Sequence, residues 1–320
     1  MKQLGNTNIK VTPIGFGVLT IGKTQLDYPV GKGADLIRYA LEKGINFLDT
    51  AQYYDTYHFI REALKGGVYT PVISSKSLKP SYREMKDAVE EARADMDRDV
   101  IDVFLLHEVA GAYDWEMRRP AWEYLNEAKA KGLVKSIGVS THHTDTAQMC
   151  ADIDEIDVLF PLINYKSLGV RTGDGPGTKE DMAEAIKGNA DAGKGVFAMK
   201  VFGGGNLTGG YLEALDYVTG LPGVDSVMIG FGHTCEVDKA IEYITGTIDR
   251  NYVPDTREKK MRIDAGDCTG CKACLVRCPN RAVYATVNPD GVEICDIDHK
   301  NCLTCGYCGP VCPVRALIMY

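Results

Sequence analysis

The chain has 320 residues, of which 45% are hydrophobic and 25% charged, and its formal net charge at pH 7 is −8. A chain of this length holds a domain with a large core and a second, smaller domain. The negative charge argues against nucleic-acid binding as the main role, and no apolar run of about 18 residues, the length of a membrane span, occurs. The first residues lack the apolar segment of a signal peptide and the 11 cysteines fit a reducing compartment, so we expect a cytoplasmic protein.

Residues 1–255 alternate between short apolar runs and longer amphipathic segments. The apolar runs predict strands that are buried on both faces. These strands are Ile14–Gly17, Phe47–Asp49, Val72–Ser75, Ile101–Leu106, Ser136–Ser140, Val158–Ile163, Val196–Met199 and Ser226–Ile229. The predicted helices between them include Ala34–Lys43, Ser81–Met96, Trp115–Lys131 and Lys179–Ala192. Ser81 and Glu84 form an N-terminal capping pattern, which places the start of one of these helices.

Eight strand-and-crossover units in about 250 residues match an α/β protein of the (β/α)8 TIM-barrel class. The alternative is an open doubly wound sheet, which usually carries a Gly-rich turn after its first strand. The segment that follows Gly15 lacks the glycine spacing of that turn. We therefore expect a barrel over residues 1–250, a connector over 251–261 and a second domain over 262–320.

Chemically active side chains follow consecutive predicted strands. Asp49 ends the second strand and Tyr54 lies in the loop behind it, while Lys76 and His107 end the third and fourth. The C-terminal ends of barrel strands meet at one mouth, so these four groups converge. They suit proton transfer to a carbonyl oxygen, with Tyr54 as the acid, Lys76 as a cation that tunes it and Asp49 as the group that keeps the lysine charged. His142 follows the fifth strand, at the rim of the same mouth, where it is either a substrate contact or an ordinary loop residue.

These residues resemble the aldo-keto reductase family in Asp49-Thr-Ala-x-x-Tyr54, in Lys76 after Val-Ile-Ser-Ser and in His107 after Leu-Leu. The opening Leu4-Gly-Asn-Thr also resembles the N-terminal hairpin of that family. The resemblance covers roughly residues 1–245. It implies that Tyr54 is the general acid, that Lys76 and Asp49 tune it, and that His107 orients the carbonyl group of a small-molecule substrate.

The resemblance is weaker at the positions where the family binds its nicotinamide cofactor. Thr141 and Leu162 stand where the family has an asparagine and a glutamine, and the cations that grip the 2′-phosphate of NADP are replaced after the eighth strand. A missing cation removes a charge-assisted contact to the 2′-phosphate. NAD(P)H is therefore a possible cofactor, with little expected preference for NADPH. A flavin has no signature here, although barrel phosphate sites need little sequence. The candidate cofactor contacts are Ser140, Asn164, Lys200, Gly203, Gly230 and Gly232.

Residues 262–320 contain one cysteine pattern twice, C-x2-C-x2-C-x3-C-P. Its short spacings bring three thiolates to one cubane cluster, and the fourth thiolate reaches the other cluster. A disulfide framework would need an oxidising compartment, and structural zinc uses paired C-x2-C units. The segment resembles the two-cluster bacterial ferredoxin module, which implies two 4Fe–4S clusters. The expected ligand sets are Cys268, Cys271, Cys274 with Cys312, and Cys302, Cys305, Cys308 with Cys278.

Together the two parts are similar to the branch of the aldo-keto reductases that carries a 4Fe–4S domain. The leading hypothesis is an oxidoreductase that acts on a carbonyl or conjugated carbonyl compound, with electrons from the clusters, from NAD(P)H or from both. Cubane clusters pass electrons singly, whereas a nicotinamide gives a hydride. Two other interpretations stay open. The barrel could be a docking module of an electron-transfer protein with a redox partner protein, or the clusters could be purely structural.

Overall fold

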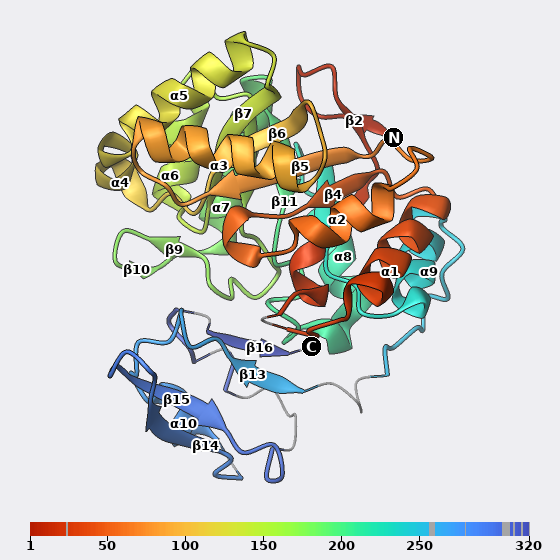
Figure 1. The fold of residues 1–320 in the computed structure, drawn as a ribbon. Helices are drawn as coiled ribbons and strands as arrows, with labels where there is room; N and C mark the ends of the chain where they lie inside the picture. The colour runs from red at the N-terminus through yellow and green to blue at the C-terminus, as the bar shows by residue number, and fades with distance from the viewer. Residues whose placement is uncertain are drawn as a thin grey trace.

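Figure 1 shows the fold in a computed structural model, which describes residues 1–23, 25–255, 260–278, 280–302, 308–309, 311–314 and 316–319. A closed barrel makes up the larger part of this described chain, and a smaller module of residues 260–319 lies against one end of the barrel. No helix within the described residues combines the length and the apolar character that crossing a membrane requires.

The barrel has eight parallel strands in the described chain, and they close in the order β11-β12-β3-β4-β5-β6-β7-β8. This confirms the predicted (β/α)8 barrel. Every predicted strand is present, although β5 and β7 are longer than predicted and β8 and β11 end one or more residues earlier. The strands are β3 (Ile14–Gly17), β4 (Phe47–Asp49), β5 (Val72–Ser77), β6 (Ile101–Leu106), β7 (Val134–Thr141), β8 (Val158–Pro161), β11 (Gly195–Ala198) and β12 (Ser226–Ile229).

Helices cover the outside of the barrel. Ser81 accepts a hydrogen bond from the N–H group of Glu84, so the predicted cap of α3 is present. The predicted helix Trp115–Lys131 is wrong as one element, because the chain breaks at Arg118, just before Pro120, and forms two helices. The helices are α1 (Val30–Glu42), α2 (Tyr57–Leu64), α3 (Tyr82–Asp95), α4 (Gly111–Met117), α5 (Arg119–Ala130), α6 (Thr144–Ala151), α7 (Lys179–Asp191), α8 (Tyr211–Thr219) and α9 (Thr234–Thr245), with short 3-10 turns η1 (Val18–Ile21), η2 (Gln52–Tyr54) and η3 (Thr208–Gly210).

The interior of the barrel is filled by aromatic and branched side chains. Phe160 stacks on Phe197 with a centroid separation of 4.1 Å, and Phe47 meets Phe197 edge-on at 5.0 Å. The hairpin of β1 (Lys2–Gln3) and β2 (Lys10–Val11) closes one end, where its Leu4 joins this core. The other end, where the strands finish, is therefore the open mouth.

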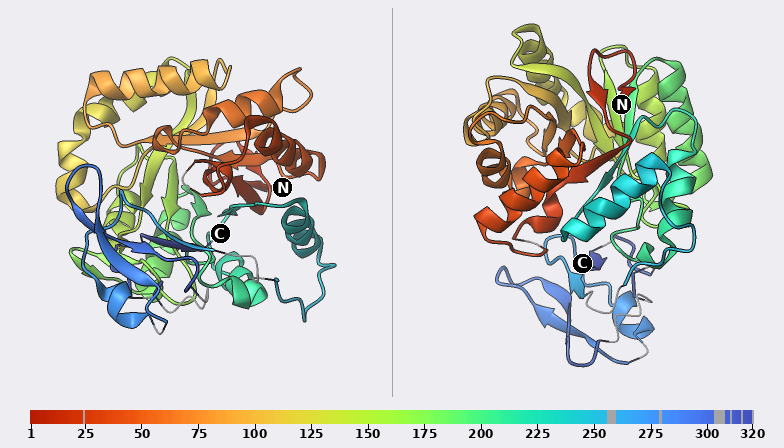
Figure 2. Two further views of the ribbon diagram at one scale, coloured as in Figure 1. Left: turned by 60° about the horizontal axis from the view of Figure 1, so that its bottom comes forward. Right: turned by 90° about the vertical axis from the view of Figure 1, so that its right-hand side faces the viewer.

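The module of residues 260–319 has two small antiparallel sheets. Strands β13 (Met261–Ile263) and β16 (Leu317–Met319) pair next to the barrel, while β14 (Val283–Val287), β15 (Glu293–Ile297) and the short α10 (Ala273–Arg277) lie farther out. The right-hand view of Figure 2 places the module at the end opposite the N-terminal hairpin, so it covers the mouth.

Three hydrogen bonds to backbone carbonyl groups fix this placement. The N–H group of Met319 donates to the carbonyl oxygen of Gly204 at 2.9 Å. Arg171, in the hairpin of β9 (Arg171–Thr172) and β10 (Gly175–Pro176), donates to the carbonyl oxygen of Pro313 at 3.0 Å. Arg262 reaches the carbonyl oxygen of Lys23 at 3.4 Å.

Two glycine-to-alanine substitutions are expected to change stability in opposite directions. A Cβ atom at Gly138 would lie 1.9 Å from the carbonyl oxygen of Val158, on the neighbouring barrel strand. We expect Gly138→Ala to lower the free energy of unfolding by about 1–3 kcal/mol, because the strands would have to separate. Gly188 lies inside α7, and only Ala151 comes within 4 Å of the place that a methyl group there would take, so Gly188→Ala should raise stability by about 0.5–1 kcal/mol. Urea unfolding followed by circular dichroism measures both changes. Changes of the same sign in the free energy of unfolding of the two variants would contradict this packing.

Candidate active site

A buried ion pair forms the base of the mouth. Asp49 ends β4 and Lys76 lies in the neighbouring strand β5, where its side chain is fully buried. The ammonium group donates to both carboxylate oxygens of Asp49 at 2.9 and 2.7 Å and to the carbonyl oxygen of Thr50 at 2.8 Å. All three N–H groups of the lysine are therefore satisfied without water.

Tyr54 and His107 stand above this pair. Tyr54 is the last residue of η2, directly behind β4, and the Lys76 nitrogen lies 4.9 Å from the centre of its ring. The ring of His107, which follows β6, meets the Tyr54 ring edge-on at a centroid separation of 5.6 Å. The four residues predicted to converge are thus brought together at one mouth by three adjacent strands.

The electrostatics of Tyr54 differ from the simple expectation that Lys76 tunes it. Among the described residues, no hydrogen bond joins the Tyr54 hydroxyl to the ammonium group, whose protons go to Asp49 and Thr50. Burial, followed by the negative charges of Asp49 and Glu108, raises the pKa of Tyr54 well above its usual value. The phenol therefore keeps its proton at neutral pH, which is the state that a proton donor needs.

His107 is neutral in this setting. Burial, together with the charge of Lys76, lowers the pKa of His107 well below its usual value. Its Nδ1 atom is buried with no hydrogen-bond partner among the described residues. A buried lone pair without a partner is tolerated better than a buried N–H group without one. We therefore assign the proton to Nε2, which makes His107 a hydrogen-bond donor.

Glu108 and His142 form a second charged pair at the rim, which the sequence interpretation did not assign. Glu108 has a left-handed backbone (φ 56°), and its N–H group donates to Ser140 Oγ at 2.8 Å. His142 Nδ1 lies 2.8 Å from Glu108 Oε1. Burial alone would raise the pKa of Glu108, but the hydrogen bond and charge of His142, with smaller contributions from nearby cations, lower it to about 2. The sequence carried no signal for this pair beyond its position after two strands.

The module of residues 260–319 approaches the barrel mouth beside Tyr53, which is still 55% exposed. Gly266 lies against Tyr53, since a Cβ atom at this glycine would be 2.8 Å from the Tyr53 hydroxyl oxygen. Burial raises the pKa of Tyr53, and the carboxylates of Asp264 and Asp267 raise it further. Asp267 also raises the pKa of Tyr54. The segment just before Cys268 is therefore part of the surroundings of the candidate acid.

The two polar side chains predicted to contact a nicotinamide are occupied by the protein itself. Ser140 Oγ accepts the Glu108 N–H group, as described above. Asn164 donates to the carbonyl oxygens of Leu168 at 3.0 Å and Lys200 at 3.4 Å, and it accepts from the N–H groups of Lys166 and Leu168. Asn164 is fully buried and holds the loop that follows β8. Its role in cofactor binding stays a prediction.

The glycines predicted to receive a phosphate are closely packed. Gly203 lies against Leu168 and Leu207. Two residues further on, a Cβ atom at Gly205 would be only 2.1 Å from the carbonyl oxygen of Met319. Gly230 is packed on Thr20, since a Cβ atom at this glycine would be only 1.7 Å from Thr20 Oγ1. Strand β16 therefore lies on the loop that was expected to cradle a phosphate.

The N-terminus of α9 is occupied by a carboxylate of the chain. Glu236 Oε2 accepts the N–H groups of Gly232 at 2.7 Å and of His233 at 3.3 Å. A helix N-terminus is a favourable place for an anion, and Glu236 already provides one. Lys200, the remaining candidate, has a left-handed backbone (φ 62°) after β11 and helps to lower the pKa of Glu108.

Four of the predicted cluster ligands line one small cavity: Cys268, Cys271, Cys274 and Cys312. Cys295 lines it as well, and its N–H group donates to Cys268 Sγ at 3.4 Å. No group of three or more metal-binding side chains in the described chain surrounds a single point, as one metal ion would require. A cubane spreads its thiolates over four corners, so this arrangement fits a cluster better than one ion.

The second predicted set is only partly described, since Cys305 lies outside the described residues. Cys278 Sγ accepts the N–H group of Ala282 at 3.2 Å. Burial alone would raise the pKa of Cys278, but N–H groups of residues 280–283 lower it. Such N–H groups around a thiolate are typical of iron–sulfur ligands.

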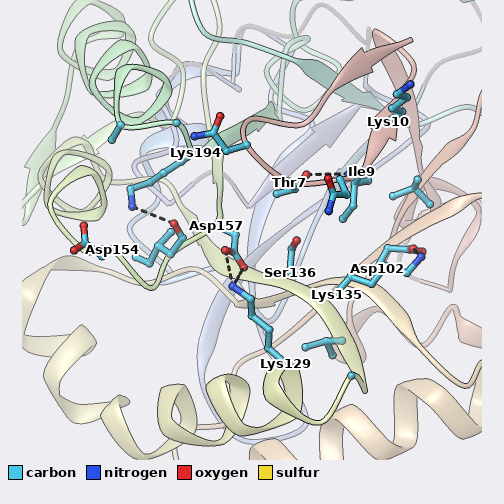
Figure 3. Close-up of a pocket in the computed structure, with 18 of the residues that line it drawn as sticks. Thr7, Ile9, Lys10, Asp102, Lys129, Lys135, Ser136, Asp154, Asp157 and Lys194 are labelled. Atoms are coloured by element: carbon cyan, nitrogen blue, oxygen red, sulfur yellow. Dashed lines mark hydrogen bonds and ion pairs between the residues drawn. The ribbon is translucent and has the colours of Figure 1, made fainter.

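A cavity of about 730 Å³ lies at the opposite end of the barrel, under the N-terminal hairpin (Figure 3). Its charged groups pair with one another, as in Lys129 with Asp157 and Lys135 with Asp102, each at 2.6 Å. Because it is separated from the four candidate catalytic residues by the barrel core, we do not assign it to the chemistry.

Comparison with known families agrees with this geometry. The model of the aldo/keto reductase family matches residues 13–249. The chain belongs to the aldo/keto reductase family. Residues 267–316 match the 4Fe-4S dicluster domain, so the chain has the predicted combination of a reductase barrel and an iron–sulfur module.

Among curated relatives, the methylglyoxal reductase DkgA of Escherichia coli is 29% identical over 175 residues, which cover 52% of this chain and 61% of that protein. The 6-dehydroglucose reductase of Novosphingobium aromaticivorans is 30% identical over 171 residues, which cover 45% of this chain and 52% of that protein. The chain thus spans between half and two thirds of the length of these relatives.

Solved structures show the same barrel. A Pseudomonas aeruginosa protein described as an aldo-keto reductase has a TM-score of 0.65 at 21% identity and covers 78% of this chain and 96% of its own. The holo form of an aldo-keto reductase from Bacillus halodurans has a TM-score of 0.59 at 20% identity, with coverages of 80% and 99%. At this identity the likeness establishes the fold.

The buried pair should behave as a unit in stability measurements. Lys76→Met leaves the Asp49 carboxylate buried without its cation, and we expect it to lower the free energy of unfolding by roughly 3–5 kcal/mol. The double variant Asp49→Asn, Lys76→Met removes both charges and should recover much of that loss. Urea titration read by the fluorescence of the buried Trp115 and Trp122 reports on the barrel. Lys131→Met, at the exposed pair with Glu127, is the control and should change little. A double variant that is no more stable than Lys76→Met would contradict the pairing.

Proposed function

We propose that this protein reduces a conjugated carbonyl compound, with Tyr54 as the proton donor and with electrons supplied through the iron–sulfur module. The observation that carries the proposal is the convergence of Asp49, Tyr54, Lys76 and His107 at one barrel mouth, directly beneath the segment that leads into Cys268. A carbonyl group at this mouth would meet two neutral donors, the Tyr54 hydroxyl and His107 Nε2–H.

These donors act where charge develops. As electrons enter a carbonyl group, negative charge grows on its oxygen, and donors already aimed at that oxygen stabilise it. Tyr54, with its raised pKa, transfers its proton only when the oxygen has become strongly basic. Lys76, whose nitrogen lies 4.9 Å from the centre of the Tyr54 ring, and Asp49 together form a nearly neutral ion pair beside the phenol.

We propose the iron–sulfur module as the electron source because the residues that would bind a nicotinamide already contact other parts of the protein. Ser140, Asn164 and Gly232 are engaged within the protein, and Gly205 is covered by Met319, so the family's dinucleotide position has few groups left to offer. Iron–sulfur clusters transfer electrons singly when bound. We propose the ligand sets Cys268, Cys271, Cys274 with Cys312 and Cys302, Cys305, Cys308 with Cys278. The many reduced thiols favour a cytoplasmic location.

Single-electron delivery narrows the substrate class. The radical formed by adding one electron to an isolated carbonyl group is high in energy, whereas an adjacent carbonyl group or double bond delocalises it. We therefore propose an α-dicarbonyl or similarly conjugated small molecule. One relative is named for methylglyoxal, which is an α-dicarbonyl.

Loss of the Tyr54 hydroxyl should remove most of the turnover. We expect Tyr54→Phe to lower the rate of methylglyoxal reduction by at least about 100-fold, the usual contribution of a positioned acid. Tyr53→Phe is the matched control, since its hydroxyl faces Gly266 outside the ion pair, and it should keep most of the activity. The rate is measured anaerobically with a reduced ferredoxin or dithionite as donor. Equal losses of rate in the two variants would show that Tyr54 is not the specific acid. No loss of rate in either variant would favour an electron-transfer protein without reductase turnover.

The protein should respond to one-electron donors but not to nicotinamides. We expect dithionite or reduced ferredoxin to bleach the visible absorbance of the anaerobic, cluster-loaded protein, whereas NADH and NADPH leave it unchanged. Isothermal titration should show no binding of either nucleotide, because Glu236 accepts the Gly232 N–H group and β16 bonds to Gly204, on the loops where we propose that its phosphates would otherwise bind. Bleaching by NADPH alone would overturn the proposed electron source while leaving Tyr54 untouched as the acid.

A further inference from the structure

The proposed electron source leaves one proton without a donor. Reduction of a carbonyl group to an alcohol consumes two electrons and two protons. A hydride carries both electrons and the proton of the new C–H bond in one particle. When electrons arrive singly, the carbon must receive its proton separately, and Tyr54 serves the oxygen. This inference therefore rests on the proposed function and asks which group serves the carbon.

The other groups of the mouth are poorly suited to this step. Lys76 directs its three protons to Asp49 and Thr50. His107 is kept neutral by burial and by the charge of Lys76, so it donates a hydrogen bond more readily than a proton. Asp49 is engaged by Lys76 on both oxygens.

We propose that His142, held by Glu108, is a second catalytic acid that protonates the substrate carbon. His142 Nδ1 lies 2.8 Å from Glu108 Oε1, and the His142 side chain is 20% exposed, so the ring is fixed yet reaches the space at the rim. Glu108 is itself held by Ser140, which accepts its N–H group at 2.8 Å. With Nδ1–H directed at the carboxylate, Nε2 is the nitrogen that exchanges a proton with the substrate.

Charged groups from several elements surround the pair. Glu108 is an anion, because His142 and nearby cations hold its pKa at about 2 against the effect of burial. Lys200, from the loop after β11, is a cation near Glu108, and the neutral His107 stands at the end of β6. Asp145 and Arg171 lie beside the adjacent His143, where their charges have opposite effects. Of these groups, the Glu108 carboxylate is the one in direct contact with His142 Nδ1, and an anion in contact favours the protonated form of an imidazole.

Each of the two reduction steps consumes one electron and one proton. A low-potential one-electron donor, such as a reduced ferredoxin, supplies each electron. The first electron breaks the C=O π bond and Tyr54 gives a proton to the oxygen, which forms a hydroxyalkyl radical. The second electron converts the radical to a carbanion, and His142 gives its proton to the carbon. Tyr54 and His142 then recover their protons from solvent.

Solvent deuterium distinguishes this route from hydride transfer. The protein is reduced with dithionite, freed of excess donor and mixed anaerobically in D2O with butane-2,3-dione, whose reduction gives one chiral alcohol. We expect deuterium on the carbinol carbon of a single enantiomer. Product incubated with oxidised protein in D2O corrects for exchange after the reaction. Absence of the label from freshly formed product would overturn the proposed electron route as well as this step.

Variants of the rim then test His142 itself. His142→Gln should slow product formation by about 100-fold or more, leave the radical detectable by electron paramagnetic resonance, and give both labelled enantiomers because solvent replaces the fixed donor. His143→Gln is the matched control at the next position, and it should retain the rate and one enantiomer. Glu108→Gln keeps the hydrogen bond but removes the charge, so its rate should fall at a lower pH than that of the unchanged protein.

The outcomes separate the two proposals. Deuterium on carbon together with an unchanged rate and a single enantiomer in His142→Gln would exclude His142 and leave the electron route intact. Iron content and bleaching by dithionite show whether each variant is folded. If His142→Gln is not folded, the pH profile of Glu108→Gln decides, and an unshifted profile overturns the assignment.

Discussion

The contact between Lys76 and Asp49 is the constraint on which the mouth of the barrel depends. Two opposite charges are buried on adjacent strands, and each is tolerable there only because the other is within hydrogen-bond distance. The pair fixes the ends of β4 and β5, and it thereby sets where the loop carrying Tyr54 begins. Burial is the main cause of the lowered pKa of His107 and the raised pKa of Tyr54, and the charges of Lys76 and Asp49, respectively, add to these shifts. A polar active site with two neutral donors is the direct result.

The rest of the mouth is arranged around the iron–sulfur module more than around a dinucleotide. Strand β16 bonds to Gly204, Gly266 lies on Tyr53, and Glu236 caps α9 from within the chain. The contacts of β16 and of Glu236 lie on loops at which the family resemblance suggested a cofactor, while Gly266 lies beside the candidate acid. The same barrel thus keeps the four candidate catalytic residues and has a second domain packed at its mouth, which agrees with the principle that function depends on the site more than on the fold.

The barrel and the four catalytic candidates could be predicted because they depend on strand ends. Asp49, Lys76 and His107 each finish an apolar run, and parallel strands in a barrel bring such residues together whatever the loops do. Ser140, Asn164 and Gly232 could not be assigned in the same way, since their contacts depend on how loops fold back on them. The break at Arg118 was missed because the apolar spacing continues through Pro120. The Glu108–His142 pair joins two loops that are distant in sequence.

The pairing of β13 with β16 has a mechanical consequence. It holds the two ends of the described module together, and β16 is bonded in turn to the barrel at Gly204. A domain joined by one flexible linker would have to search for its docking position, and its effective concentration there would depend on linker length. Here both ends are clamped at the same place, so the module has no such search to make. The contact of β16 with Gly204 therefore ties both ends of the described module to the barrel mouth.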